Sequence, residues 1–187
     1  TYTDLNYCTN NQTISLMVNN LTNITSSNSL INEFCFNDSI SVLNNYFPIG
    51  GTYFGNGISN NLFNPTLAGI GQQLVNYEFI DSNGCISNVL DTFNVNALPV
   101  VNLTSIELCE NSLPIVLNNG LPTGGTYSGN GIFNSSFDPI NINPGNSILT
   151  YLITDSNNCS NSDASFIKIN QNPFVSFNLM DNLCRNE

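Results

Sequence analysis

One stretch of eleven residues occurs twice in this chain. Residues 48–58 read Pro-Ile-Gly-Gly-Thr-Tyr-Phe-Gly-Asn-Gly-Ile, and residues 122–132 read Pro-Thr-Gly-Gly-Thr-Tyr-Ser-Gly-Asn-Gly-Ile. Nine of the eleven positions are identical, and the offset between the copies is 122 − 48 = 74 residues. A period of this size is typical of a tandem array in which each repeat is one structural unit. The 187 residues therefore predict two full repeats with parts of their neighbours.

Each repeat has the pattern of short β-strands. Apolar and polar residues alternate along residues 74–80 and 149–153, which places the apolar side chains on one face. Asp-Ser-Asn-Gly at 81–84 is a hairpin signal, because Asn-Gly favours turns with positive φ. No segment keeps a 3.6-residue periodicity over the length of a helix. We therefore predict an all-β fold of tandem immunoglobulin-like β-sandwich repeats of about 74 residues.

Two prolines mark the expected joints between repeats. Pro99 and Pro173 stand 173 − 99 = 74 residues apart, and each precedes a new run of alternating apolar residues. We expect the C-terminal end of a preceding repeat over residues 1–21, immunoglobulin-like repeats over 22–98 and 99–172, and the start of a following repeat over 173–187. The first of these segments is expected to include a strand from Thr13 to Val18.

The charge balance argues against several classes of partner. The chain has two basic residues, Lys168 and Arg185, against 13 acidic ones, and its formal net charge is −11. Nucleic acids and anionic membrane surfaces attract clusters of Lys and Arg, so neither is expected as a partner. No run of 18 apolar residues is present, so we expect no membrane insertion.

Catalytic chemistry finds no support in the sequence. The chain has no histidine, and its lone lysine, Lys168, lies on a predicted strand. Glu107 and Glu110 flank Cys109, where a solvated rim is the simpler interpretation than acid–base catalysis. Three carboxylates, Asp4, Asp81 and Asp155, precede hairpin turns singly, which favours Asx turns over calcium sites. We predict that the protein is not an enzyme and carries no catalytic residues, metal or cofactor.

Six cysteines follow the period of the repeat. They stand at positions 8, 35, 85, 109, 159 and 184, with 109 − 35 = 74 and 159 − 85 = 74. Their wide spacing argues against zinc, and periodic cysteines in a lysine-poor chain are typical of disulfides in an oxidising, extracellular compartment. The expected pairs are Cys35–Cys85 and Cys109–Cys159, because each repeat then carries its own bond. Cys8 and Cys184 would pair beyond the chain or stay free.

Two other pairing schemes remain open. Cys8–Cys35, Cys85–Cys109 and Cys159–Cys184 would pair all six cysteines across the joints. A bond such as Cys35–Cys159 would instead pass over the two cysteines between them. Pairing within a unit meets an objection, because the two cysteines of a standard sandwich lie at opposite poles, too far apart to bridge. The first strand would have to be short or displaced.

One order of residues is shared by both repeats: Cys, then Gly-Gly-Thr-Tyr-x-Gly-Asn-Gly-Ile, then Phe-(Asn/Asp)-Pro, then Tyr-x-x-x-Asp-x-Asn-(Gly/Asn)-Cys. It covers nearly the whole chain and resembles the tandem immunoglobulin- and PKD-like repeats of very large Bacteroidota surface proteins. These include SprB-type adhesins associated with gliding motility and substrates of type IX secretion. The resemblance implies a secreted, cell-surface location and a role as a stalk.

The sequence also suggests a modification site. Asp38-Ser39-Ile40 is similar to the Asp-(Ser/Thr)-aliphatic motif for O-glycosylation in Bacteroidota, which makes Ser39 the candidate residue.

We predict that the chain is a structural repeat segment of a long extracellular adhesin or surface filament, acting as stalk or spacer, with neighbouring repeats as its partners. A first alternative is a module that binds carbohydrate or a surface through exposed Tyr46, Phe54 and Asn44-Asn45. The counterparts of Tyr46 and Phe54 in the second repeat are Gly120 and Ser128, so both aromatics are lost there. A second alternative is sideways association of copies into a filament, because few lysines protect the edge strands.

Overall fold

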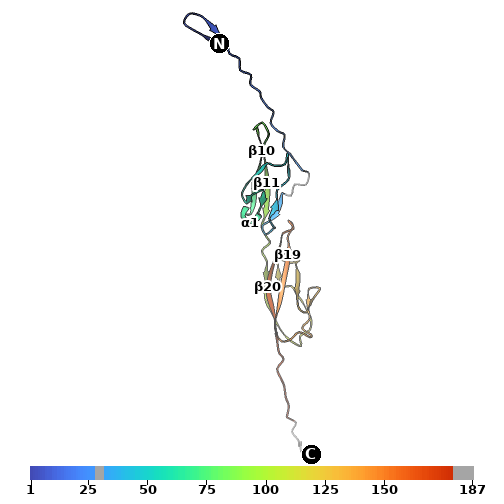
Figure 1. The fold of residues 1–187 in the computed structure, drawn as a ribbon. Helices are drawn as coiled ribbons and strands as arrows, with labels where there is room; N and C mark the ends of the chain where they lie inside the picture. Colours follow the sequence, from blue (N-terminus) through green and yellow to red (C-terminus); the bar gives the residue numbers. More distant parts are fainter. Residues whose placement is uncertain (28–31, 179–187) are drawn as a thin grey trace, which may run out of the picture. The chain divides into compact units, whose positions relative to one another are not determined.

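The computed structural model describes residues 1–27 and 32–178, and nearly all of its regular structure is β-strand (Figure 1). The chain divides into two compact units, Thr1–Val95 and Asn96–Glu187. The all-β fold predicted from the sequence is confirmed. No helix within the described ranges is long and apolar enough to cross a membrane.

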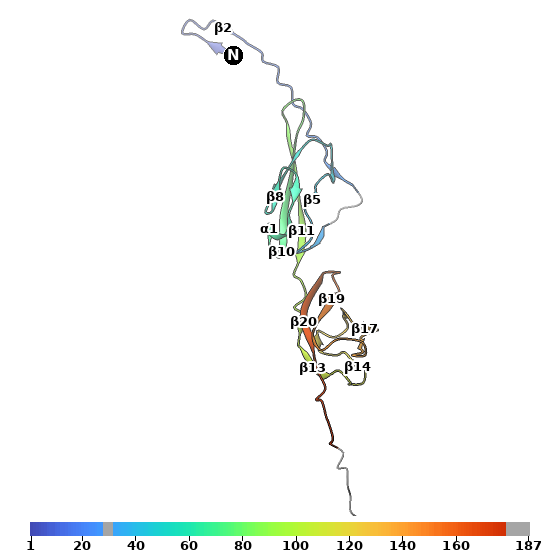
Figure 2. The ribbon, with the colours of Figure 1, turned by 60° about the horizontal axis from the view of Figure 1, so that its bottom comes forward.

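The first unit is built around one long hairpin. After the N-terminal hairpin, the described part of this unit contains β3 (Thr25–Ser26), β4 (Glu33–Cys35), β5 (Ser41–Val42), β6 (Tyr46–Phe47), β7 (Thr52–Gly55), β8 (Ile58–Ser59), β9 (Leu62–Phe63), α1 (Pro65–Ala68), β10 (Gly71–Ile80) and β11 (Ile86–Asn96). The four-stranded sheet has the order β4-β11-β10-β7, and smaller sheets are β5-β9-β8 and β3-β6. Figure 2 shows β10 and β11 running side by side along the length of this unit.

The second unit repeats this arrangement. Its strands are β12 (Asn102–Leu103), β13 (Ile106–Cys109), β14 (Ile115–Val116), β15 (Gly120–Leu121), β16 (Thr126–Gly129), β17 (Ile132–Phe133), β18 (Ser136–Phe137), β19 (Gly145–Thr154) and β20 (Ser160–Asn170). The sheets are β13-β20-β19-β16, β14-β18-β17 and β12-β15. The bounds of β10 and β19 differ by 145 − 71 = 74 at one end and 154 − 80 = 74 at the other.

The core of each unit forms where the long hairpin faces the small sheets. Val75 and Tyr77 of β10 point inward with Phe93 and Val95 of β11, and all four are at most 1% exposed. The equivalent core of the second unit contains Leu149, Tyr151, Ile167, Ile169 and Phe137. The alternation predicted for these strands is therefore confirmed, because a strand sends successive side chains to opposite faces.

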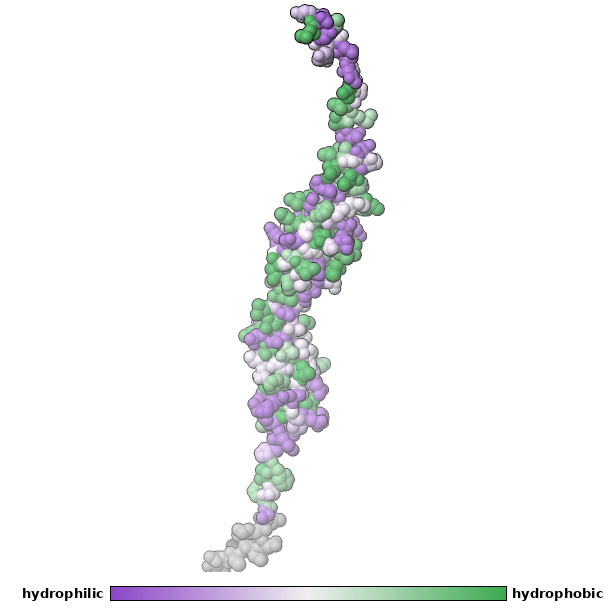
Figure 3. Space-filling view, turned by 60° about the vertical axis from the view of Figure 1, so that its left-hand side comes forward, coloured by the Kyte–Doolittle hydropathy of each residue, from purple (hydrophilic) through white to green (hydrophobic). Residues whose placement is uncertain are grey.

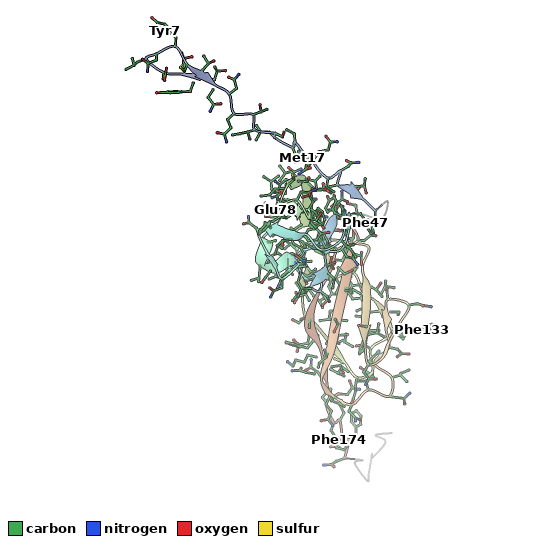
Figure 4. All side chains as sticks on the ribbon, turned by 45° about the horizontal axis from the view of Figure 1, so that its top comes forward. Tyr7, Met17, Phe47, Glu78, Phe133 and Phe174 are labelled. Atoms are coloured by element: carbon green, nitrogen blue, oxygen red, sulfur yellow. The ribbon has the colours of Figure 1, made fainter. Side chains whose placement is uncertain are left out.

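Residues 1–27 contain one expected and one unexpected feature. A short hairpin of β1 (Tyr2–Thr3) and β2 (Thr9–Asn10) forms at the predicted turn. Residues 13–18, predicted as a strand, form none, and Leu16 and Val18 are 88% and 89% exposed. A strand needs a hydrogen-bonded neighbour, and no part of the described chain pairs with this segment. Figure 4 shows Tyr7 in the turn of the short hairpin and Met17 on the segment without a strand.

Helix α1 was not expected from the sequence, because its four residues are too few for a periodic pattern. It begins at Pro65, where proline suits the first helical turn. The Asn64 side chain caps it by accepting hydrogen bonds from the amides of Thr66 and Leu67.

Candidate functional site

The repeated eleven-residue stretch surrounds a buried tyrosine in each unit. In the first unit, the Tyr77 hydroxyl donates a hydrogen bond of 2.5 Å to the Pro48 carbonyl and accepts one of 2.9 Å from the Gly51 amide. In the second unit, the Tyr151 hydroxyl makes the same bonds with Pro122, at 2.6 Å, and Gly125, at 2.7 Å. The X–Pro peptide bonds preceding Pro48 and Pro122 are both cis.

The second glycine of each Gly-Gly pair leaves room for this tyrosine. A Cβ at Gly125 would lie 2.4 Å from the Leu152 carbonyl oxygen and 2.5 Å from the Tyr151 ring. A Cβ at Gly51 would meet Glu78 and Tyr77 at 2.4 and 2.5 Å. Real Cβ atoms do not approach so closely, so glycine is required at both positions by packing.

A second tyrosine of the stretch completes the arrangement. The ring of Tyr53 packs on Tyr77 with 4.7 Å between centroids, and that of Tyr127 packs on Tyr151 at 4.6 Å. The Tyr127 hydroxyl accepts a hydrogen bond of 2.6 Å from the Gly120 amide. The proline, the second glycine and the tyrosine of the shared stretch are thus used in contacts within each unit.

A hollow lies beside this stretch in both units. Its nine lining residues in the first unit are Leu43, Asn44, Tyr46, Ile49, Gly50, Gly51, Tyr53, Asn61 and Tyr77. Adding 74 to each number gives the nine that line the hollow of the second unit, Leu117 to Tyr151. The volumes are about 90 Å³ and about 210 Å³. Three lining residues are smaller in the second unit: Gly120 stands in place of Tyr46, Thr123 in place of Ile49 and Ser135 in place of Asn61.

The sequence was wrong about Tyr46, which was expected to be exposed for binding. Tyr46 is 4% exposed, stacks on Tyr77 and donates a hydrogen bond of 2.5 Å to an Asp91 carboxylate oxygen. Burial, and next the hydrogen bond to Asp91, raise the pKa of Tyr46 well above its ordinary value. Burial also raises the pKa of Tyr53.

The remaining residues of the predicted binding surface do not form one site with Tyr46. Phe54 is 48% exposed and follows the buried Tyr53 on β7, so the two side chains point to opposite faces. Asn44 is exposed and Asn45 is partly buried. Other apolar side chains face solvent as well, such as Phe133, which is 78% exposed and projects from the second unit (Figure 4). Figure 3 shows apolar and polar surface interspersed over both units.

The predicted disulfides within each unit are not formed. Cys35 and Cys159 are disulfide-bonded, whereas Cys85 and Cys109 carry free thiols. The topology gives the reason. Cys109 pairs with Asn170 at the end of β20, whereas Cys159 immediately precedes the start of that strand. Eleven residues of strand separate them by roughly 35 Å, far beyond the Cα distance of a disulfide.

The same geometry separates Cys35 from Cys85. Strand β4, which ends at Cys35, neighbours β11, and the Asn94 amide near the end of β11 donates to the Asn32 carbonyl. Cys85 immediately precedes the start of β11. The cysteines of one unit thus lie at opposite poles. Cys8 is a free, exposed thiol, and Cys184 lies outside the described residues.

The hairpin carboxylates form Asx turns, as predicted. One Asp81 oxygen accepts hydrogen bonds of 2.8 and 2.9 Å from the amides of Asn83 and Cys85. Asp155 accepts the same pair at 2.9 Å each from Asn157 and Cys159, and Asp4 does so from Asn6 and Cys8. Residues 1–27 and 32–178 contain no cluster of acidic, cysteine or histidine side chains that could hold a metal ion.

The other residues singled out from the sequence lie on the surface. Ser39 is exposed between β4 and β5, and the neighbouring Asp38 accepts a 2.7 Å hydrogen bond from the Cys35 amide. Glu107 accepts from Lys168 at 2.8 Å and from Asn170 at 2.9 Å. The hydrogen bond from Lys168 lowers the pKa of Glu107.

The tyrosines that anchor the repeated stretch were not recognised from the sequence as its partners. Tyr77 and Tyr151 were assigned only to the apolar faces of their strands. A signal was present, since both follow the central Gly-Gly pair by the same number of residues.

Comparison of the chain with models of known protein families and with curated proteins gives no match.

Proposed function

We propose that this chain is a structural repeat segment of a long extracellular adhesin or surface filament, in which the β-sandwich units act as stalk or spacer. Its partners are neighbouring repeats of the same kind. The proposal follows the resemblance to Bacteroidota surface proteins and goes beyond the all-β fold itself.

One observation carries the proposal. The most repeated residues of the chain, the Gly-Gly-Thr-Tyr stretch, are used within each unit to hold Tyr77 and Tyr151. Here the residue that would widen or close the hollow differs between units, Tyr46 in one and Gly120 in the other. What the repeats have in common is a means of folding, as expected for a spacer.

The chemistry of the chain agrees with an extracellular setting. The disulfide-bonded state of Cys35 and Cys159 favours an oxidising compartment, because cytosolic proteins keep their thiols reduced. The net charge of −11 argues against nucleic acid as a partner.

Electron microscopy of the native parent protein, on cells or shed from them, tests the proposal. We expect a thread of beads, each bead one unit. A fibre of uniform width with helical order would contradict a simple stalk and would favour a self-associating filament subunit. That alternative has its own motivation, because no described strand pairs with the outer edges of β7 and β16.

A carbohydrate-binding module is the second candidate, and the larger hollow of the second unit is the observation that favours it. Tyr127, Asn118 and the glycine backbone line a space of about 210 Å³. A glycan array probed with the whole chain decides between the two. Under the stalk proposal we expect no glycan bound. Binding that is lost on Asn118→Ala, and unchanged on the matched Asn44→Ala of the first unit, would favour the module.

A further inference from the structure

Four of the described cysteines occupy two kinds of position, related by the period of the repeat. Cys35 and Cys109 end the first strand of their four-stranded sheets, and we call them the turn cysteines. Cys85 and Cys159 close the turn of the long hairpin, and we call them the hairpin cysteines. The offset is 74 residues in both pairs, 109 − 35 and 159 − 85.

The two turn cysteines have the same backbone surroundings. The Cys35 amide donates to Asp38 Oδ2 at 2.7 Å, and the Asp38 amide donates to the Cys35 carbonyl at 3.0 Å. The Cys109 amide donates to Ser112 Oγ at 3.1 Å, and the Ser112 amide returns to the Cys109 carbonyl at 3.0 Å. In both units, the polar side chain three positions after the turn cysteine therefore closes a turn.

The two hairpin cysteines are equally alike. The Cys85 amide lies 2.9 Å from Asp81 Oδ1, and the Asp81 amide lies 3.0 Å from the Cys85 carbonyl oxygen. The Cys159 amide lies 2.9 Å from Asp155 Oδ1, and the return bond is also 2.9 Å. The backbone hydrogen bonds thus give no reason for members of a pair to differ in chemistry, although Cys159 is buried and Cys85 is partly buried.

They do differ in chemical state. Among the turn cysteines, Cys35 is disulfide-bonded and Cys109 is a thiol; among the hairpin cysteines, Cys159 is bonded and Cys85 is a thiol. Each kind of position is therefore able to carry a disulfide in this fold. The bonded cysteines comprise one of each kind. Cys109 is exposed and Cys85 is partly buried, so both thiols can be reached.

We propose that Cys85 and Cys109 are disulfide positions whose partners belong to other repeats: a turn cysteine bonds to Cys85, and a hairpin cysteine bonds to Cys109. The parent array would then be covalently joined from repeat to repeat. This inference rests on the proposed role as a repeat segment and names the partner that the segment takes.

The reaction is an oxidation of two thiols. Each new S–S bond forms as two S–H bonds break, and the two electrons and two protons pass to a disulfide donor, which is reduced to two thiols. The donor is a small-molecule or protein disulfide of the oxidising compartment. Joining one repeat to another leaves each unit's own hydrogen bonds unchanged.

Differential labelling of the native parent protein tests the chemical state. The protein is unfolded without reductant and treated with one alkylating reagent, then reduced and treated with a second, and its peptides are analysed by mass spectrometry. We expect Cys85 and Cys109 to carry the second label, as Cys35 and Cys159 do. The first label on Cys85 and Cys109 would overturn the proposal.

Two matched variants of this chain test the pairing of the two kinds. In a Cys8→Ser, Cys184→Ser background, Cys85→Ser leaves Cys109 as the thiol, and Cys109→Ser leaves Cys85. The two variants are mixed at high protein concentration in a glutathione redox buffer. We expect at least ten times more Cys85–Cys109 heterodimer in the mixture than disulfide-linked homodimer of either variant. Dimers in statistical proportion would overturn the specific pairing.

These tests separate the inference from the proposed function. A parent protein that shows a thread of beads by microscopy, with Cys85 and Cys109 reduced, would leave the stalk in place and remove the covalent joints. A parent with both cysteines oxidised and no thread of beads would remove the stalk and leave the disulfides.

Discussion

The Tyr151 hydroxyl donates a hydrogen bond of 2.6 Å to the main-chain carbonyl of Pro122. The two residues stand 29 positions apart in the chain, and Tyr77 and Pro48 make the equivalent bond at the same separation. The contact fastens the start of the Gly-Gly stretch to the central strand of the four-stranded sheet.

Loss of this hydroxyl should destabilise the second unit. Tyr151→Phe keeps the ring but leaves the Pro122 carbonyl and the Gly125 amide without their partner. We expect a loss of about 2 kcal/mol in the free energy of unfolding, the usual cost of an unsatisfied, partly buried pair. Urea unfolding followed by hydrogen-exchange mass spectrometry reports each unit separately. Tyr2→Phe, at a side chain 75% exposed, is the matched control and should change nothing.

Adding a single methyl group should distinguish the two glycines of the pair. A Cβ at Gly125 meets the Leu152 carbonyl at 2.4 Å, whereas a Cβ at Gly124 meets nothing within 4 Å. Gly124 has φ +102°, so Gly124→Ala should cost about 1 kcal/mol from backbone strain alone. Gly125→Ala should cost about 3 kcal/mol, because backbone atoms must move. Equal costs in urea unfolding would contradict the packing role of Gly125.

The first unit should lose stability in alkali. The pKa of Tyr46 is raised above its ordinary value of 10.0 by burial and by Asp91, so above pH 10 the folded state holds a proton that the unfolded chain releases. Stability is therefore intact below pH 10 and falls as pH rises beyond it. The slope for one group approaches about 1.4 kcal/mol per pH unit.

Tyr46→Phe provides the control for the alkaline loss. The variant lacks the titrating hydroxyl, so its urea midpoint between pH 10 and 11.5 should fall less steeply than that of the unaltered chain. A residual slope is expected from Tyr53, whose pKa burial also raises. Identical slopes for the two proteins would show that Tyr46 does not cause the alkaline loss.

The Asx turn should stabilise the long hairpin of the second unit. Asp155→Ala removes the acceptor of two amide hydrogen bonds at 2.9 Å, from Asn157 and Cys159. We expect a loss of about 1–2 kcal/mol and faster amide exchange at Cys159. Asn157→Ala, at an exposed side chain with only its amide in the turn, should leave both quantities unchanged. A larger loss of stability for Asn157→Ala than for Asp155→Ala would contradict the role of the Asx turn.

Much of the fold could be read from the sequence, because its information is local and occurs twice. The alternation along residues 74–80 and 149–153 identified the central strands, and Asp-Ser-Asn-Gly located the hairpin. The cost of placing apolar side chains in water fixes which face of such a strand is buried. The Asx turns followed from the preference of aspartate for its own backbone amides.

The site was harder to predict, because its contacts join distant positions. Tyr46 looks like any loop aromatic until Tyr77 and Asp91 close around it, and residues 13–18 look like any strand until no neighbour is found. The cysteines also separate what local sequence determines from what the tertiary structure decides. The sequence by itself determined the period, the strands and the turns at Cys109 and Cys159; only the tertiary structure decided that these cysteines lie at opposite ends of β20. A strand advances about 3.3 Å per residue, and its neighbour's direction is set by sheet topology, which no local pattern encodes.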